Sequence, residues 1–204
     1  MEKSVEKDLL TDILESFVIA MAFSIVIFFT IIAPNQVDGE SMEPTFHNED
    51  KLITNKVSQW LGSTEVGKSM GLEYDRGDIV VFSLGDRDLV KRVIAKGGDK
   101  IKIQNGSVYV NGNLLQEKYL PEGLLTRTFI GPFSFISEGQ ELTVPNNHFF
   151  VMGDNRGNSK DSRFSEVGFV SRDQVRGRVA FKYWPLSEIH AVTKGDFVEV
   201  APTN

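Results

Sequence analysis

The chain has 204 residues, 41% of them hydrophobic, and its net charge of −6 argues against a nucleic acid partner, because phosphate binding needs clustered Lys and Arg. It contains no cysteine, which excludes disulfides, thiolate nucleophiles and Cys-ligated zinc. Its three histidines, His47, His148 and His190, lack metal-ligand spacing, and we predict neither a metal site nor a cofactor.

An uncharged apolar run extends from Phe17 to Ala33. At ~1.5 Å per residue this run forms a helix about 26 Å long, and extending it back to Ile13 closes the gap to a hydrocarbon core ~30 Å thick. A cleaved signal peptide is the competing interpretation, but its apolar region is typically only ~7–15 residues long. Ile31-Ile32-Ala33 is also a poor cleavage site. We therefore predict a retained transmembrane anchor over residues 13–34.

The distribution of basic residues predicts the orientation of this anchor. Lys3 and Lys7 precede the apolar run, whereas the first lysine after it is Lys51. The positive-inside rule then places residues 1–12 in the cytoplasm and residues 35–204 outside it. The predicted location is the cell membrane, with a single pass and an extracytoplasmic domain.

The rest of the chain has the pattern of a β protein. Asn105-Gly106, between Ile101-Lys102-Ile103 and Val108-Tyr109-Val110, is the strongest hairpin signal, and Asn111-Gly112 signals a second turn. Further strands are expected over residues 52–54, 78–82, 89–96, 127–130, 140–144, 148–152 and 175–183. Gly62 to Gly71 reads as a surface loop. Turns roughly every 8–12 residues predict a strongly bent antiparallel sheet or a barrel-like arrangement.

The first candidate for chemistry is Ser41, within Gly39-Glu40-Ser41-Met42-Glu43-Pro44-Thr45. Gly39 allows a tight backbone approach, and Pro44 fixes φ and removes a donor. A rigid loop that holds one hydroxyl still suits a nucleophile. A serine in an ordinary turn is the alternative interpretation.

The second candidate is Lys91, on a predicted strand. With a side-chain period of two, Lys91 shares its face with Leu89, Val93 and Ala95. Burial among apolar neighbours lowers the pKa of a lysine, and a neutral amine can take a proton from a serine. A lysine at a strand edge, extending its amine to water, is the alternative.

The third candidate is the polar run from Gly153 to Arg163, which follows the apolar segment Phe149-Phe150-Val151-Met152. Short polar side chains and glycines are typical of a solvated loop. The same run offers alternating acids and bases, with hydroxyl and amide groups that could orient a nearby amine.

Together these stretches resemble the type I signal peptidase family, the membrane-bound Ser/Lys leader peptidases of bacteria, in its Gram-positive-like form. The resemblance covers roughly residues 13–185. Four matches occur in the family's order: Ser41-Met42-x-Pro44-Thr45, Arg76-Gly77-Asp78-Ile79-Val80-Val81-Phe82, Val90-Lys91-Arg92-Val93-Ile94, and Gly153 through Arg163. The turn Ala95-Lys96-Gly97-Gly98-Asp99 departs from the family's usual Gly-Leu-Pro-Gly-Asp.

The resemblance implies a catalytic pair. Ser41 would be the nucleophile and Lys91 the general base, and the backbone N–H of Ser41 would be one oxyanion donor. In some members a serine two residues before the nucleophile supplies the second donor. Gly39 occupies that position here and is assigned with Ser41 to the predicted oxyanion site, but it has no hydroxyl, which leaves the second donor open.

The resemblance also implies residues that orient the pair. Ser159 would hydrogen-bond the amine of the base. Arg92 and Asp154 would form one ion pair that stiffens the site, and Asp161 and Arg163 a second.

The implied function is the removal of signal peptides from exported preproteins, with cleavage after small, Ala-like residues. The implied partners are the preproteins, the lipid bilayer and the secretion machinery. Residues 100–147 would form a small inserted β lobe, in which Phe129 to Ile136 would either contact the bilayer surface or belong to the core. The alternatives are a self-cleaving repressor-type Ser/Lys protease, and an anchored β domain without catalytic activity that binds partners outside the cell.

Overall fold

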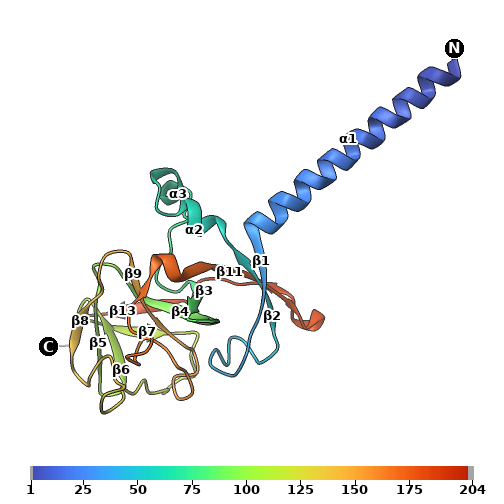
Figure 1. The fold of residues 1–204 in the computed structure, drawn as a ribbon. Helices are drawn as coiled ribbons and strands as arrows, with labels where there is room; N and C mark the ends of the chain where they lie inside the picture. The colour runs from blue at the N-terminus through green and yellow to red at the C-terminus, as the bar shows by residue number, and fades with distance from the viewer. Residues whose placement is uncertain (1, 202–204) are drawn as a thin grey trace.

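The computed structural model describes residues 2–201, as a long N-terminal helix followed by two antiparallel β-sheets (Figure 1). Helix α1 spans Glu2–Ile31, and its segment Thr11–Phe28 is long and apolar enough to cross a membrane and is not buried against the domain. The helix ends three residues before the predicted anchor boundary at residue 34, because Ile32–Gln36 pairs as a strand. Residue 1 of the predicted cytoplasmic segment and residues 202–204 of the predicted domain lie outside the described residues.

The first sheet carries the chemistry-bearing segments. Its path is β1-β2-β11-β3-β4-β9-β10, with β12 paired to β11, and all its pairings are antiparallel. The bounds are β1 Ile32–Gln36, β2 Lys51–Asn55, β3 Ile79–Leu84, β4 Arg87–Lys96, β9 His148–Met152, β10 Val170–Ser171, β11 Val175–Trp184 and β12 His190–Ala191. Its two end strands, β1 and β10, do not pair with each other within residues 2–201, so this sheet is open and not a closed barrel.

The second sheet forms the smaller lobe. Its order is β13-β7-β6-β5-β8. The bounds are β5 Lys100–Gln104, β6 Ser107–Val110, β7 Asn113–Glu117, β8 Glu141–Thr143 and β13 Phe197–Val200. The predicted hairpin at Asn105-Gly106 is present, with φ of 52° and 76° at these residues, as a primed turn requires. The sheet extends beyond the predicted residues 100–147, because β13 from the end of the chain pairs with β7.

Two segments differ from the predictions in secondary structure. The predicted loop Gly62 to Gly71 contains a short helix, α3 (Glu65–Ser69), whose first turn is capped by the Thr64 hydroxyl, and α2 (Val57–Leu61) precedes it. The predicted strand at 127–130 is wrong, because these residues adopt no regular structure and the Phe129 ring stacks on Phe164 instead. Two 3₁₀ helices, η1 (Arg172–Gln174) and η2 (Leu186–Glu188), complete the elements.

Strand β4 has buried side chains on both faces of the first sheet. Its two central charged residues, Lys91 and Arg92, are therefore buried as well. Val93 belongs to one apolar cluster, with Val80 and Phe82, whereas Ile94 belongs to another, which joins the two sheets. Successive side chains on a strand point to opposite faces, so Lys91 and Arg92 enter different environments.

Candidate active site

Ser41 lies in the loop of residues 37–50, between β1 and β2. Met42 and Phe46 are fully buried and hold this loop against the first sheet, in an apolar cluster with Val37. At the far end of the loop, the buried carboxylate of Asp50 accepts from the Lys182 amine at 2.6 Å. The loop therefore fixes Ser41 while leaving it partly exposed.

Lys91 lies on β4 beside this loop, and its side chain is 2% exposed. Its Nζ donates a hydrogen bond to Ser41 Oγ at 2.7 Å and another to the backbone carbonyl of Val90 at 2.9 Å. A base within about 2.6–3.2 Å of a hydroxyl is within reach of its proton. The structure thus brings the two predicted catalytic side chains into direct contact.

The surroundings of Lys91 favour its neutral form. Burial lowers the pKa of Lys91 to about 8, against the opposing effect of the Asp161 and Asp154 carboxylates. An amine with a pKa near 8 is uncharged in roughly one tenth of molecules at pH 7 and in about half at pH 8, and only the uncharged form can accept a proton.

The run from Gly153 to Arg163 packs against the Ser41 loop. The backbone N–H of Asn155 donates to the Ser41 carbonyl at 3.1 Å, and the Thr45 hydroxyl donates to Asp154 at 2.6 Å. Gly153 is at the contact, since a Cβ there would lie 2.4 Å from the Ser41 carbonyl oxygen. A side chain at this position would push the two loops apart.

Both predicted ion pairs are present, and both are buried. Arg92 donates to Asp154 from Nε and Nη2 at 2.9 and 2.6 Å. Arg163 donates to Asp161 from Nε and Nη2, both at 2.8 Å. Bidentate geometry of this kind fixes the orientation of a carboxylate.

Two predicted details are absent. The Ser159 hydroxyl is buried and has no hydrogen-bond partner within residues 2–201, so it does not bond Lys91, whose amine is directed at Ser41 Oγ and the Val90 carbonyl. Gly39 adopts φ +91°, and its N–H is occupied by the side-chain oxygen of Asn48 at 2.8 Å. Gly39 thus shapes the loop and offers no free oxyanion donor in this structure.

The sequence model of the family described as signal peptidase, peptidase S26, matches residues 10–184. The chain belongs to this family. Signal peptidase I S of Bacillus subtilis (strain 168) is 35% identical over 175 residues, covering 86% of this chain and 89% of the relative. Signal peptidase IB of Staphylococcus aureus (strain COL) is 36% identical over 189 residues, covering 87% and 92%.

A crystal structure of a signal peptidase I from Enterococcus faecalis V583 is also similar. It is 29% identical, with a TM-score of 0.42, and covers 52% of this chain and 96% of that chain. Family membership makes the chain a serine endopeptidase of the signal peptidase type.

A further buried ion pair, absent from the sequence-based predictions, supports the same loop of this peptidase. Arg156 donates from both terminal nitrogens to the two carboxylate oxygens of Glu117, at the end of β7, and also to the Thr126 hydroxyl at 2.7 Å. Its Nε donates to the Gly153 carbonyl at 3.1 Å. The smaller lobe therefore holds the segment that contacts Ser41.

Tyr119 links this ion pair to Arg92. Its phenol donates to Glu117, and its ring lies under the Arg92 guanidinium, 3.9 Å from the ring centroid. Burial and the Glu117 carboxylate raise the pKa of Tyr119 well above its ordinary value, so the phenol stays protonated as a donor. Nothing in the local sequence distinguishes Glu117 from an exposed strand-end glutamate.

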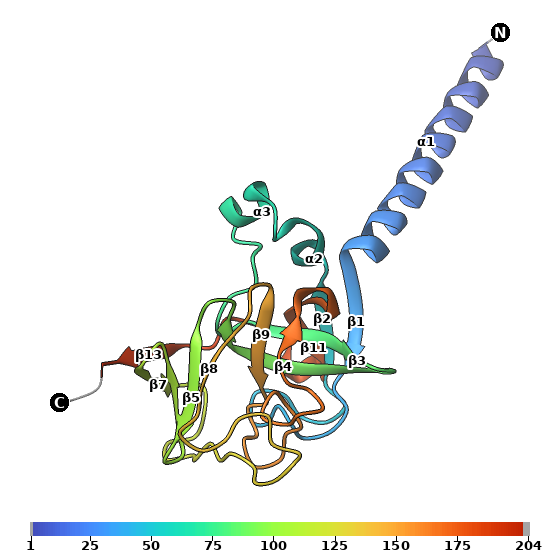
Figure 2. The same cartoon turned by 60° about the vertical axis from the view of Figure 1, so that its left-hand side comes forward.

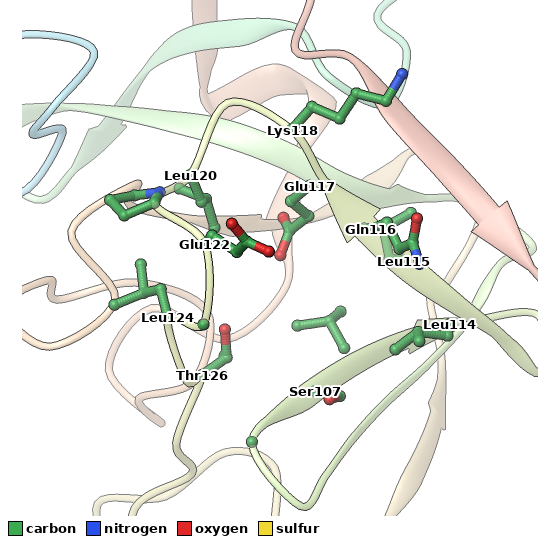
Figure 3. A pocket seen from close by; sticks show the side chains of 14 residues that line it. Ser107, Leu114, Leu115, Gln116, Glu117, Lys118, Leu120, Glu122, Leu124 and Thr126 are labelled. Atoms are coloured by element: carbon green, nitrogen blue, oxygen red, sulfur yellow. The ribbon is translucent and has the colours of Figure 1, made fainter.

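A pocket of about 530 Å³ separates β7 from the residues that follow it and contains a second glutamate near Glu117. Figure 3 shows the carboxylates of Glu117 and Glu122 pointing toward each other at one wall of the pocket. Glu117 is 7% exposed and paired with Arg156, whereas Glu122 is exposed. The two glutamates therefore form a matched pair for mutagenesis.

Glu117→Gln is expected to lower the free energy of unfolding by about 3 kcal/mol, because it leaves the buried Arg156 charge without its partner. The released loop should also reduce kcat by roughly 10–100-fold, since a displacement of about 1 Å at a site has such effects. Thermal unfolding and precursor turnover in detergent measure both. Glu122→Gln is the control and should change neither. Equal behaviour of the two variants would contradict the positioning role of Glu117.

The segment Phe129 to Ile136, expected to contact either the bilayer or the core, divides between core and solvent. Ile136 is fully buried and Phe135 packs on Phe169, whereas Ile130 and Phe133 are exposed. In both views the chain between β7 and β8 lies at the opposite end of the domain from α1 (Figures 1 and 2). This location favours the core interpretation. Within the described residues no group of three or more His, Asp or Glu side chains could hold a metal ion.

Proposed function

We propose that this chain is a membrane-anchored signal peptidase in which Ser41 and Lys91 form the catalytic pair. The observation that carries this proposal is the 2.7 Å contact between Lys91 Nζ and Ser41 Oγ, made by an amine that is almost fully buried. Its substrates are exported preproteins, as the names of its relatives indicate.

The reaction follows from this contact. Neutral Lys91 accepts the hydroxyl proton as Ser41 Oγ attacks the carbonyl carbon of the scissile bond. The backbone N–H of Ser41 donates to the oxyanion of the tetrahedral intermediate. Protonated Lys91 then gives its proton to the leaving amine, and in its neutral form takes one from the water that hydrolyses the acyl-enzyme.

A free strand edge beside Ser41 supports binding of the precursor as an added strand. Strand β4 pairs with β3 along residues 87–92, but with β9 only along residues 92–96. Within residues 2–201 its residues 87–91 therefore have one unpaired edge, which ends at Lys91. An extended peptide can bond this edge through its backbone. The buried Val37, Met42 and Val81 fill the space beside Val90, which supports a preference for small side chains before the cut.

The membrane placement extends the sequence-based prediction. Helix α1 would cross the bilayer once, with residues 1–12 in the cytoplasm and the domain from residue 35 onward outside it, as the lysine distribution indicates. The secretion machinery that delivers preproteins to this side of the membrane would be a further partner.

The two alternatives have less support. A repressor-type Ser/Lys protease has no need of the apolar helix α1, and the acidic chain lacks a basic segment for DNA. A binding module has no need of a buried lysine directed at a serine.

Cleavage of a preprotein followed by N-terminal sequencing of the product tests the proposal. The full chain in detergent should cut after an Ala-x-Ala segment, and replacing the alanine just before the cut with leucine should reduce cleavage about 100-fold, because the side chains packed around Val90 leave little room for a bulky group. The same precursor with a leucine two residues before the cut is the control. Cleavage at other sites, or none, would contradict the proposed specificity.

A further inference from the structure

The chain between β2 and β3 forms a projection that the catalytic site does not use. Helices α2 and α3, here called the helical hairpin (residues 57–69), stand out from the first sheet on the side from which α1 leaves (Figures 1 and 2). Ser58 is buried, and its carbonyl accepts from Arg172 Nη2 at 2.8 Å. This contact fixes the hairpin to the body of the domain.

The hairpin exposes an unusual amount of apolar surface for its size. Trp60, Leu61, Val66 and the adjoining Met70 are 50%, 41%, 64% and 66% exposed. Single exposed apolar residues are normal on a protein surface, whereas a cluster marks a binding surface. Helices of five residues also gain little stability on their own, so they depend on what packs against them.

The position of the hairpin indicates what covers this surface. The backbone N–H of Lys56 donates to the carbonyl of Ile31, the last residue of α1, at 2.8 Å. Because α2 begins at the next residue, Trp60 lies only about one helical turn of chain beyond the end of α1. The apolar cluster therefore lies close to the end of α1, where the predicted span leaves the membrane.

The charge of the hairpin fits the same surface. Residues 56–71 contain Lys56, Lys68 and a single acid, Glu65, which pairs with Lys68 at 2.8 Å, so this segment has a net charge of +1, whereas the whole chain has a net charge of −6. Basic residues beside exposed tryptophan and aliphatic side chains are typical of segments that lie in the headgroup region of an anionic bilayer.

We propose that the helical hairpin is a second membrane contact, which inserts Trp60, Leu61, Val66 and Met70 into the lipid interface beside α1. This inference rests on the proposed anchoring by α1. Two contacts prevent the domain from rotating about a single helix. They hold the Ser41 loop at a fixed height, about 17 Å from the end of α1 along the five-residue strand β1.

Tryptophan quenching tests this contact directly. The chain has two tryptophans, so the full chain carrying Trp184→Phe keeps Trp60 as its only reporter. In anionic vesicles whose acyl chains are brominated near the headgroup, Trp60 emission should fall by about half relative to unbrominated vesicles, because interfacial side chains reach about 5–10 Å into the bilayer. Flotation of the same vesicles reports anchoring independently.

The outcomes are distinguishable. A chain that floats with the vesicles and shows no quenching of Trp60 overturns the inference and leaves the anchor intact. Protection of Trp60 from acrylamide without quenching by lipid would assign the surface to a protein partner, and would also overturn it. A chain that does not float refutes the anchor, and with it the second contact.

Charge substitutions test the same contact against a matched control. Val66→Glu combined with Met70→Glu should abolish the quenching of Trp60 and slow cleavage of a bilayer-inserted preprotein, while a soluble peptide is cut at the same rate. Ile130→Glu combined with Phe133→Glu adds the same two charges on side chains that are 99% and 73% exposed, in the chain between β7 and β8 at the far end of the domain, and should change none of these measurements (Figures 1 and 2). Equal effects of the two substitutions would refute a lipid contact at the hairpin.

Discussion

Ser41→Ala is expected to abolish preprotein cleavage, with a fall in rate of about 10⁴-fold or more, because it removes the attacking atom. Ser159, the other serine predicted in the site, is not expected to replace it, since its hydroxyl is buried and makes no hydrogen bond to Lys91 within residues 2–201. The variant should remain folded, because the Ser41 side chain supports no apolar packing. Precursor turnover, followed on gels and by sequencing of the product, measures the loss.

Ser83→Ala is the control for this substitution. Ser83 lies on β3, and its hydroxyl makes only a long contact of 3.4 Å with the Gly85 carbonyl. Its loss should leave turnover within about twofold of the unsubstituted chain, as expected of a surface change. A Ser41→Ala chain that still produces the same N-terminus would remove Ser41 from the mechanism.

The fold was predictable where local patterns decide it. Asn105-Gly106 fixes a primed turn whatever surrounds it, and the uncharged run in α1 identifies a helix long enough to span a bilayer. Strand β13 was not predictable, because it forms by pairing with β7, a contact between distant parts of the chain. The helices of the hairpin were not predictable for a different reason. Each has only five residues, and so short a helix shows too little hydrophobic periodicity to be recognised in the sequence.

The candidate site residues that lie in sequence motifs were predictable, whereas the buried residues that hold those motifs in place were not. Ser41, Lys91 and the two ion pairs lie in stretches that resemble a family, and the alternation along β4 already placed Lys91 among apolar neighbours. Glu117 and Tyr119 act through burial and long-range contacts, which no local signal reveals. Whether the Ser159 hydroxyl bonds the Lys91 amine depends on the direction in which that amine points, and this direction is decided by side-chain packing that the sequence does not reveal.

Lys91→Met is expected to reduce the rate of cleavage by about 10³–10⁴-fold, the upper range for a lost general base. Lys91→Arg should be equally inactive at every pH, because a guanidinium does not lose its proton in a protein. The unsubstituted enzyme should accelerate as the Lys91 amine becomes neutral. With a pKa of about 8, the neutral fraction is roughly one eleventh at pH 7 and ten elevenths at pH 9, so single-turnover rates should rise about tenfold between them.

Lys91→Met should also stabilise the protein, by an amount that depends on pH. The pKa of Lys91 is about 8 in the folded chain and near 10.5 when unfolded, so the unfolded state binds more protons between these values. The penalty for a buried charge is thus fully present below about pH 8 and disappears as the pH rises towards 10.5. Lys91→Met removes it, which corresponds to ~3 kcal/mol at pH 7, or about 6–12 °C in Tm for a chain of this size.

Thermal unfolding of the two proteins in detergent, at pH 7 and at pH 10.5, separates this effect from ordinary repacking. The variant should be clearly more stable at pH 7, and the two melting temperatures should nearly converge at pH 10.5, where the amine is neutral in the folded chain and about half neutral in the unfolded chain, so that only ~0.4 kcal/mol of the penalty remains. A gain from packing alone would be the same at both values. A Lys91→Met chain that is less stable than its parent at pH 7 would mean that Lys91 is held in its charged form, and a charged amine cannot accept the proton of Ser41.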